Sequence, residues 1–401
     1  MKLRCITCGT AVTADPASSP FCKKCGDLTE WISDRKPSVS ALLPPPQEFT
    51  LWRYASLLPE IDEGGIITLS EGGTPLQFSD RISEFIGIEE LLIKNEGRNP
   101  TGSFKDRGMS VALTHAKSAG FKSAVCASTG NTAASMAAYS AKAGMTPFVI
   151  VPRGMVARAK LGQAAAYGAN ILEVEGNFDR ALDIVREISS RGETAIMNSI
   201  NPLRVEGQKT AAFEVCDQLS SAPDWLIIPV GNGGNITSYW KGFREFKLIG
   251  AASSLPKMVA VQAEGASPIV SSFREGTDLP AKMENPETVA SAIRIGRPAN
   301  WRRALAAVRE SKGLAVTVSD SEIVAARKLL ADREGILAEL ASASTIAAAI
   351  RLRREGRIRG DETVVCVTTG NGLKDLDQSP EPETTTVRTA VDAMKLIRGS
   401  E

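Results

Sequence analysis

Short runs of β-forming residues alternate with helical stretches along most of the chain, and this alternation restricts the fold more than any other feature. Two of the helical stretches are the Ala-rich segments 132–144 and 321–335. The β-forming runs lie at 90–95, 123–128, 146–152, 170–176, 224–230, 257–265 and 363–370. Strands that alternate with helices form parallel sheets with helices on both faces, because a parallel pair of strands needs a long crossover connection. We therefore predict an α/β protein whose ligands bind at the carboxyl ends of the strands.

The composition excludes several classes of partner. With 401 residues, of which 43% are apolar, the chain is long enough for two or three domains with their own cores. A formal net charge of +1 favours neither nucleic acid nor an anionic membrane surface. No apolar stretch approaches the roughly 18 residues of a membrane span, and the N-terminus lacks the apolar segment of a signal peptide. We therefore predict a cytoplasmic protein that acts on a small molecule, with no nucleic-acid or membrane partner.

Two pairs of cysteines near the N-terminus predict a metal site. Cys5 and Cys8 form one C-x-x-C pair, Cys22 and Cys25 form another, and thirteen residues lie between the two pairs. A glycine follows each pair and lets the backbone turn towards the sulfur atoms. Four thiolates so spaced can surround a zinc ion and leave no open coordination position, which predicts a structural zinc-ribbon-like segment over 1–35. The alternative is four unrelated reduced cysteines.

The remaining cysteines and the single histidine offer little catalytic chemistry. Cys126, Cys216 and Cys366 lie in apolar segments and are predicted to be inert core residues. His115 lies in a helical segment with polar neighbours, where we expect a surface or half-buried side chain without a catalytic role. Acid and base catalysis must then come from lysine, from carboxylates or from a cofactor.

The segment NEGRNPTGSFKDRG (95–108) places a lysine at the predicted start of a helix. Ser103 and Asp106 have the spacing of a capping box, so that Lys105 is expected in the first helical turn. There the helix dipole disfavours a positive charge, and an amine with a lowered pKa is what imine formation with an aldehyde requires. The alternative is a solvated lysine that merely begins a helix, and these residues alone leave both interpretations open.

Three further loops follow predicted strands and supply the context that Lys105 needs. Residues 129–132 (TGNT) offer hydroxyl groups and free amides, and 231–235 (GNGGN) can surround a phosphate with backbone amides. The second loop is neither a Walker loop nor a dinucleotide fingerprint, since Ile236 stands where the third glycine belongs; its alternative is a tight structural turn. A threonine pair ends the last run at 368–369. An imine-forming lysine, a phosphate loop and a separate hydroxyl predict pyridoxal phosphate as the cofactor.

These segments closely resemble the threonine synthases, which are pyridoxal-phosphate enzymes of the tryptophan-synthase-β-like fold. The resemblance covers nearly the whole chain, and several ordered motifs are far more specific than any one of them. Besides the cysteine pairs, the motifs are LWRYASLLP (51–59), SEGGTPL (70–76), NPTGSFKDRG (99–108), STGNTAAS (128–135), NSINPLRVEGQKT (198–210), PVGNGGN (229–235), ASAIRIGRPANW (290–301) and TGNGLKD (369–375).

The resemblance implies two three-layer α/β domains preceded by the zinc-ribbon-like segment. Four prolines in 36–48 predict a linker after that segment. The expected parts are a large cofactor-binding domain (45–109 and 200–380), a small α/β domain (110–199) and a C-terminal extension (381–401). A homodimer is expected from the resemblance alone.

The resemblance also implies a role for each site residue. Lys105 carries the covalent imine to the cofactor, Asn131 bonds the phenolic oxygen of its ring, and Thr369 contacts the pyridine nitrogen. The cofactor phosphate is expected to bind the loop formed by Gly231, Asn232, Gly233, Gly234 and Asn235.

The implied substrate is O-phospho-L-homoserine, which is converted with water into L-threonine and phosphate. Arg204 presents the planar, permanently charged fork that suits a second phosphate, although it has the alternative of pairing with Glu206 or with another core acid. The other implied ligands of the substrate phosphate are Thr132, Ser199 and Asn235, with Ser128 and Thr129 directed towards the carboxylate.

Three other functions share parts of this pattern. A cysteate synthase or a serine/threonine dehydratase uses the same lysine and phosphate loop, and phosphohomoserine is only one methylene longer than phosphoserine. A non-catalytic regulator that binds a partner through its zinc ribbon is the third alternative. Retention of Lys105, Asn131, the glycine loop and Arg204 disfavours the regulator.

Overall fold

The computed structural model describes residues 2–12, 20–33, 49–61, 65–154, 158–176 and 178–378, with a few residues beyond 383. The linker predicted at 36–48 lies outside the described residues, as does most of the extension predicted at 381–401. Within the described part, the predicted α/β class is confirmed.

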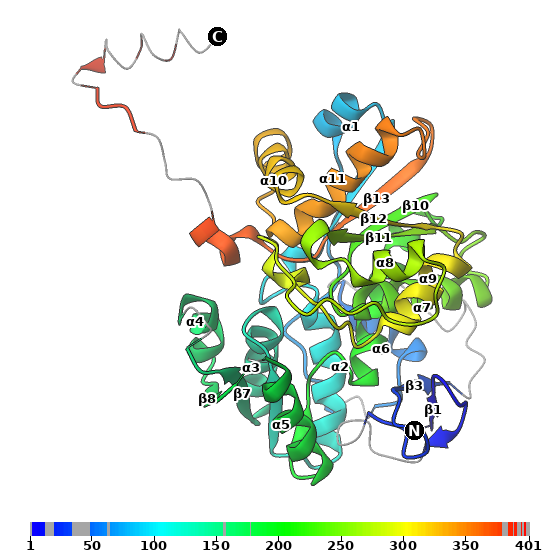
Figure 1. Ribbon diagram of the computed structural model, residues 1–401, viewed down its shortest axis with the longest axis vertical. Coiled ribbons are helices and arrows are strands. Elements are labelled where there is room, and N and C mark those ends of the chain that lie inside the picture. Colours follow the sequence, from blue (N-terminus) through cyan, green and yellow to red (C-terminus); the bar gives the residue numbers. More distant parts are fainter. Residues whose placement is uncertain are drawn as a thin grey trace.

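The described strands form three sheets (Figure 1). A six-stranded sheet has the order β12-β11-β10-β13-β5-β4, a four-stranded sheet has the order β8-β7-β6-β9, and a small N-terminal sheet, here called the ribbon sheet, has the order β2-β1-β3. The strands of the six-stranded sheet are β4 (Leu76–Phe78), β5 (Glu90–Asn95), β10 (Trp225–Pro229), β11 (Lys257–Ala263), β12 (Leu314–Val318) and β13 (Thr363–Thr368). Those of the four-stranded sheet are β6 (Ser123–Ala127), β7 (Thr146–Pro152), β8 (Asn170–Val174) and β9 (Ala195–Ile196). Those of the ribbon sheet are β1 (Lys2–Cys5), β2 (Ala11–Val12) and β3 (Thr29–Ile32).

The helices lie on the faces of the two larger sheets, as crossover connections require. They are α1 (Asp80–Ile86), α2 (Lys105–Ser118), α3 (Asn131–Ala143), α4 (Arg158–Ala166), α5 (Phe178–Ser190), α6 (Pro202–Leu219), α7 (Gly234–Leu248), α8 (Pro268–Arg274), α9 (Trp301–Glu310), α10 (Asp320–Glu334) and α11 (Leu340–Arg354). Figure 1 shows α3, α4 and α5 around β7 and β8, and α10 and α11 beside the six-stranded sheet.

All seven β-forming runs predicted from the sequence form strands, and both Ala-rich segments form helices. Pairing within the two larger sheets is parallel except at β4, which pairs antiparallel with β5 at the edge of the six-stranded sheet. Among the strands of the two larger sheets, β4, β9 and β12 were not predicted. The first two are only three and two residues long, so that no alternating pattern could reveal them.

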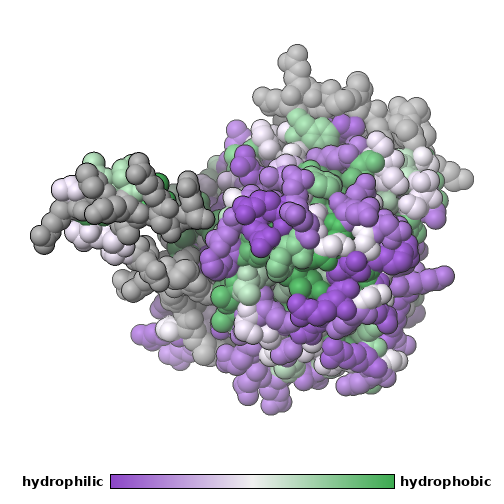
Figure 2. All heavy atoms as spheres, turned by 90° about the horizontal axis from the view of Figure 1, so that it is seen from above, coloured by the Kyte–Doolittle hydropathy of each residue, from purple (hydrophilic) through white to green (hydrophobic). Residues whose placement is uncertain are grey.

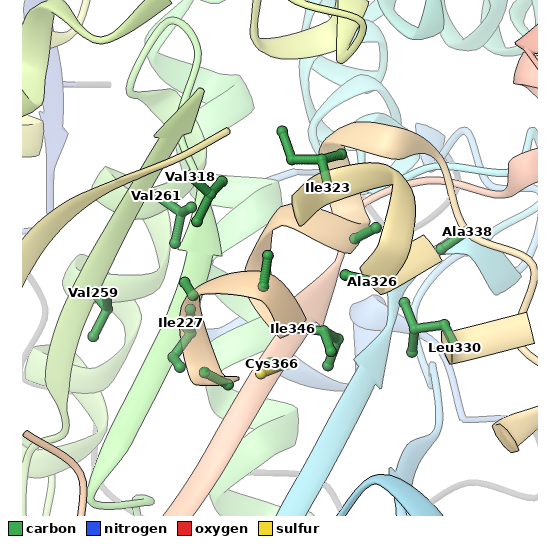
Figure 3. Packing of buried hydrophobic residues seen from close by; sticks show 14 of the residues in the cluster. Ile227, Val259, Val261, Val318, Ile323, Ala326, Leu330, Ala338, Ile346 and Cys366 are labelled. Carbon is green, nitrogen blue, oxygen red and sulfur yellow. The ribbon is translucent and has the colours of Figure 1, made fainter. Parts of the chain in front are cut away.

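An apolar core fills the space between the six-stranded sheet and α10 and α11 (Figure 3). Many of its β-branched side chains come from buried parallel strands, and its small side chains let α11 approach the sheet. The members labelled in Figure 3 are Ile227, Val259, Val261, Val318, Ile323, Ala326, Leu330, Ala338, Ile346 and Cys366. This core fixes the sheet whose carboxyl edge carries the candidate site.

The ribbon sheet packs against the rest of the molecule through apolar and polar contacts. Leu28 lies in one buried cluster with Val125 and Ile150 of the four-stranded sheet. Lys241 of α7 donates a hydrogen bond from Nζ to the carbonyl oxygen of Trp31, at 3.0 Å. The ribbon sheet therefore contacts elements that belong to both larger sheets.

A buried network of charges joins β5, α2 and α6. Arg107 donates to Glu96 Oε2 at 2.6 Å and to Glu214 Oε1 at 2.6 Å, and Lys94 Nζ lies 2.8 Å from Glu214 Oε2. All four side chains are fully buried. Burial disfavours each isolated charge, so the network is stable only while every member keeps its partners.

The Glu214→Ala variant is expected to lose about 3–5 kcal/mol of unfolding free energy, because two buried cations lose a shared partner. Urea unfolding measures the loss. The matched control is Glu187→Ala, which removes a solvent-exposed partner of Arg191 at 3.3 Å and should cost less than about 1 kcal/mol. Equal losses in the two variants would contradict the proposed importance of the network.

The surface is mostly hydrophilic on the face drawn in Figure 2, where apolar side chains occupy smaller areas between polar ones. Large apolar side chains that are well exposed include Leu248, Leu279 and Leu373. Among the helices of the described residues, none is both long enough and apolar enough to span a membrane.

Candidate active site

Close packing of α2, α6 and α7 brings the beginnings of three helices together. A Cβ atom on Gly108 would lie 2.9 Å from the carbonyl oxygen of Arg204, and one on Gly242 would lie 2.4 Å from that of Lys209. Both distances are shorter than a side chain tolerates, so only glycine permits these helix contacts. The first turns of α2, α6 and α7 contain Lys105, Arg204 and Asn235 respectively, and the charge of Arg204 acts on the Lys105 amine.

Lys105 begins α2, as predicted, but the predicted capping box is wrong. Phe104 occupies the N-cap position, and no side chain caps the helix. Ser103 Oγ is buried without a hydrogen-bond partner. Asp106 instead accepts hydrogen bonds from the Thr101 backbone N–H at 2.7 Å and the Thr101 hydroxyl at 2.6 Å. The acid therefore stabilises the preceding turn, and Ser103 stays available beside the lysine.

The Lys105 amine is half-buried and has a perturbed pKa. Desolvation, which is the largest cause, and the positive charge of Arg204 lower its pKa from 10.5 to about 7, while the charge of Glu339 opposes the shift. Nζ lies 4.0 Å from the centre of the Phe104 ring. At neutral pH a lysine in this environment is neutral, and so nucleophilic, in a large fraction of the molecules, which excludes the alternative of a fully solvated lysine.

Arg204 is a buried cation for which the described part of the chain provides no acidic partner. Its side chain is 2% exposed, Nη1 donates to the carbonyl oxygen of Met197 at 3.1 Å, and Nε has no hydrogen-bond partner. The alternative pairing with Glu206 is wrong, because Glu206 binds Lys209 and Lys241 instead. Burial lowers the pKa of Arg204 to about 10. Since an unpaired buried charge is costly, this arrangement suits an anionic ligand.

The loop 231–235 joins β10 to α7 and has the features of a phosphate site. Gly233 has φ +80°, which only glycine adopts readily, and a Cβ on Gly231 would lie 3.1 Å from the carbonyl oxygen of Ala292. Asn235 is 8% exposed, yet neither its amide oxygen nor its amide nitrogen has a hydrogen-bond partner. The free amides at the start of α7 and the side chain of Asn235 together suit a phosphate group.

Asn300 connects this loop to the segment that precedes α6. Its backbone N–H donates to the carbonyl oxygen of Asn232 at 2.9 Å, and its Nδ2 donates to the carbonyl oxygen of Ser199 at 3.1 Å. The two loops predicted to bind phosphates are therefore tied together. Asn300 lies in the motif at 290–301, but no role could be predicted for it, because nothing in the sequence indicates a contact across 101 residues.

Thr369 lies at the end of β13, directly beside the start of α2. Its carbonyl oxygen accepts a hydrogen bond from the Phe104 backbone N–H at 3.0 Å, and its hydroxyl lies 3.0 Å from Ser342 Oγ. Ser342 also accepts a hydrogen bond from the Gly370 backbone N–H at 3.0 Å. Ser342 is a member of the site that the sequence analysis missed.

The predicted loop at 129–132 leads from β6 into the start of α3. Asn131 donates from Nδ2 to Glu339 Oε1 at 2.7 Å, and Ser135 donates to Asp106 at 2.6 Å, which joins α3 to α2. Ser128 accepts a hydrogen bond from the Gly130 backbone N–H at 3.2 Å. Thr129, Thr132 and Ser199 are half-buried. Glu339 is a second residue that the sequence analysis missed.

The four N-terminal cysteines also meet, as predicted. Their Sγ atoms all lie within 4.8 Å of one another, with 3.3 Å between Cys5 and Cys25 and 3.7 Å between Cys8 and Cys22. Four sulfurs around a tetrahedral zinc, each about 2.3 Å from the ion, would be about 3.8 Å apart. The donor set and its spacing therefore fit a zinc ion.

The remaining cysteines and the histidine are not among the residues of the candidate site. Cys126, Cys216 and Cys366 are buried, as predicted, and burial raises the pKa of each thiol to about 12. His115 is 9% exposed, so the predicted half-exposed position is wrong. Burial lowers its pKa to about 4, which keeps it neutral.

The residues of the site fit pyridoxal phosphate. An aldehyde requires a neutral lysine amine, which Lys105 supplies, and a phosphate requires backbone amides and polar side chains, which the loop 231–235 and Asn235 supply. The buried and unpartnered Asn235 amide indicates a ligand at that place. Arg204 adds a second site for an anion.

Comparison with solved structures shows the same fold. The chain is similar to maize serine racemase, with a TM-score of 0.66 and 20% identity over 82% of this chain and 94% of the other. It is also similar to the processed form of threonine deaminase isoform 2 from Solanum lycopersicum, with a TM-score of 0.64 and 23% identity over 74% and 79% of the two chains. At such identities the likeness shows the fold alone.

Comparison of sequences identifies the family. A family model described as pyridoxal-phosphate dependent enzyme matches residues 67–370. The chain is 51% identical to the threonine synthase of Methanocaldococcus jannaschii over 381 residues, which are 94% of each chain. It is 49% identical to the threonine synthase of Methanosarcina acetivorans over 399 residues, which are 98% of this chain and 97% of the other. The chain therefore belongs to the threonine synthase family of pyridoxal-phosphate-dependent enzymes.

Proposed function

We propose that this protein catalyses the threonine synthase reaction, in which O-phospho-L-homoserine and water become L-threonine and inorganic phosphate. The observation that carries the proposal is Arg204, a buried guanidinium without a carboxylate partner whose charge acts on the Lys105 amine. A phosphorylated substrate supplies the missing anion. About half of the residues are identical to those of named threonine synthases over nearly the whole chain, which supports the same reaction.

We infer a separate binding place for each part of the two ligands. The residues inferred to hold pyridoxal phosphate are Lys105, Asn131, Gly231, Asn232, Gly233, Gly234, Asn235 and Thr369. The residues inferred to bind the substrate are Ser128 and Thr129 for the carboxylate, and Thr132, Ser199, Arg204 and Asn235 for the phosphate. When bound, pyridoxal phosphate supplies an electron sink for the negative charge that develops beside the substrate amino group.

Lys105 is the inferred acid and base of the reaction. With a pKa of about 7, its amine nitrogen Nζ can accept a proton from a substrate carbon and later donate that proton back to the substrate. Neither transfer then carries a large energetic penalty. Arg204 orients the substrate and stabilises the phosphate that leaves. Thr369 offers a neutral hydroxyl, which is hydrogen-bonded to Ser342. An acid in this position would keep the pyridine nitrogen of the cofactor protonated, whereas a hydroxyl group does not. A neutral partner moderates the electron sink and disfavours side reactions such as transamination.

The competing activities are tested in one assay. Purified protein is incubated with O-phosphohomoserine, with phosphoserine plus sulfite, and with serine or threonine alone, and the threonine, cysteate, keto acid and phosphate formed are measured. Threonine and phosphate in equal amounts from O-phosphohomoserine support the proposal. If cysteate is the main product, the protein is a cysteate synthase instead, and if keto acid is the main product, it is a dehydratase. No turnover of any substrate would indicate a non-catalytic regulator.

The division into domains and the assembly are further proposals. Strands of the four-stranded sheet lie between 123 and 196, whereas those of the six-stranded sheet lie on both sides of that interval, which supports the small domain at 110–199 inside a large one at 45–109 and 200–380. The homodimer and the cytoplasmic location stay predictions. Light scattering of the purified protein tests the dimer.

We also infer that the cysteine cluster binds one zinc ion with a structural role. The Cys22→Ser variant is expected to lose the ion and to melt at a lower temperature, because the ribbon sheet then loses its internal cross-link. Elemental analysis gives the zinc content, and a thermal scan gives the stability. The Cys366→Ala control, which changes a buried cysteine outside the cluster, should keep the zinc. Wild-type protein that takes up no zinc from zinc-containing medium would refute the assignment.

A further inference from the structure

A buried carboxyl group in the candidate site has no assigned function. Glu339 immediately precedes α11 and is 4% exposed. Its backbone N–H donates to the carbonyl oxygen of Gly370 at 3.0 Å, and its Oε1 accepts the hydrogen bond from Asn131 Nδ2 at 2.7 Å. Its Oε2 is buried and has no hydrogen-bond partner. A buried polar atom left unpartnered is costly, so this position requires an explanation.

The carboxyl group lies between two residues that are inferred to contact the cofactor. Asn131 comes from the helix that follows β6 of the four-stranded sheet, whereas Thr369 directly follows β13 of the six-stranded sheet. A Cβ atom on Gly370 would lie 2.2 Å from Glu339 Oε2. The glycine after Thr369 therefore makes the room that the carboxyl group occupies. The Asn131–Glu339 hydrogen bond joins the carboxyl edges of the two larger sheets.

The charges around Glu339 show that it is not committed to an ion pair. Burial, which is the largest cause, and the negative charge of Asp375 raise its pKa from 4.5 to about 7. The hydrogen bond from Asn131 and the charges of Lys374 and Lys105 lower it. The only side chain among the described residues that bonds it directly is the amide of Asn131. An amide has two N–H groups, and an acceptor that engages one of them fixes the direction of the other.

We propose that Glu339 is a positioning residue, which holds the Asn131 amide from across the two sheets so that Asn131 meets the bound cofactor in one orientation. The proposal rests on the proposed function, because it takes Asn131 to contact the cofactor ring. A carboxyl oxygen suits this task since it accepts the hydrogen bond whether or not the group carries a proton. Preorganised supporting contacts of this kind set the geometry of a catalytic site.

The test is a double-mutant cycle in the holoenzyme with Glu339→Ala, Asn131→Ala and both changes together. Glu339→Ala is expected to lower kcat by about 10–100-fold, with a smaller change in KM, and to shift the visible absorption band of the lysine-bound cofactor. Because Glu339 acts through Asn131, the double variant should lose no more activity than Asn131→Ala alone. Glu339→Gln should recover most of the loss, since its amide oxygen can accept the same hydrogen bond.

A purely structural role would give a different pattern. The control Glu334→Ala removes a carboxylate that accepts from the Ile82 backbone N–H at 2.8 Å, and it should lower the melting temperature without moving the absorption band. Losses from Glu339→Ala and Asn131→Ala that multiply, or a Glu339→Ala enzyme with wild-type kcat and absorption, would overturn the proposal. Wild-type enzyme that fails to convert O-phosphohomoserine sinks the proposed function instead, while the band of the Glu339→Ala variant still decides the role of Glu339.

Discussion

The Lys105→Ala variant is expected to lose at least about 10³-fold in kcat and to stay colourless when mixed with pyridoxal phosphate. Alanine can neither form the imine that absorbs visible light nor move a proton. Absorption spectra and steady-state kinetics measure the two losses, and borohydride reduction followed by peptide mapping should label Lys105 in the wild type only. The control Lys328→Ala, a surface change in α10, should keep both colour and activity. A coloured Lys105→Ala protein would show that another amine binds the cofactor.

The lowered pKa of Lys105 adds a pH dependence to this prediction. An acylating reagent attacks only neutral amines, so labelling of Lys105 in cofactor-free protein should rise with pH around a midpoint of about 7. A short lysine-containing peptide added to the same sample, whose side-chain amine has the ordinary pKa of about 10.4, gives the reference curve. Mass spectrometry after brief labelling gives both curves from one sample. Identical midpoints for the two lysines would contradict the argument from burial.

The Arg204→Met variant is expected to lose about 10²-fold or more in kcat/KM for O-phosphohomoserine while keeping or raising its melting temperature. Methionine fills a similar volume but cannot bind phosphate. Removing a charge that is 2% exposed and has no carboxylate partner relieves an unfavourable burial. Loss of substrate binding together with gain of stability is typical of a residue kept for function.

The matched control is Arg351→Met, because Arg351 has the partner that Arg204 lacks. Its Nη2 lies 2.7 Å from Glu322 Oε2. That variant should lose stability and leave the KM for O-phosphohomoserine unchanged. If Arg204→Met instead lowers the melting temperature strongly and leaves KM unchanged, Arg204 is a structural residue and the phosphate site lies elsewhere.

Much of the fold could be predicted because its signals are local. The buried strands of parallel sheets are apolar over their whole length, so runs such as 224–230 and 363–370 are visible in the sequence. The glycine loop at 231–235 is visible because its conformation requires residues without side chains. A local pattern failed at Ser103, where the spacing of a capping box was present but the carboxylate of Asp106 bonded Thr101 instead. The carboxylate of Asp106 had two possible partners nearby, Ser103 and Thr101, and the sequence does not show which of them it bonds.

The sequence by itself determined the α/β class and the family, and it predicted the cofactor lysine and the phosphate loop, because each depends on a short run of residues in a fixed order. Only the tertiary structure decided that Arg204 has no carboxylate partner and that Glu339 bonds Asn131, since the latter contact joins residues 208 positions apart. Such pairings depend on how helices and sheets pack, and glycines at Gly108 and Gly242 set that packing through distances that no single segment encodes.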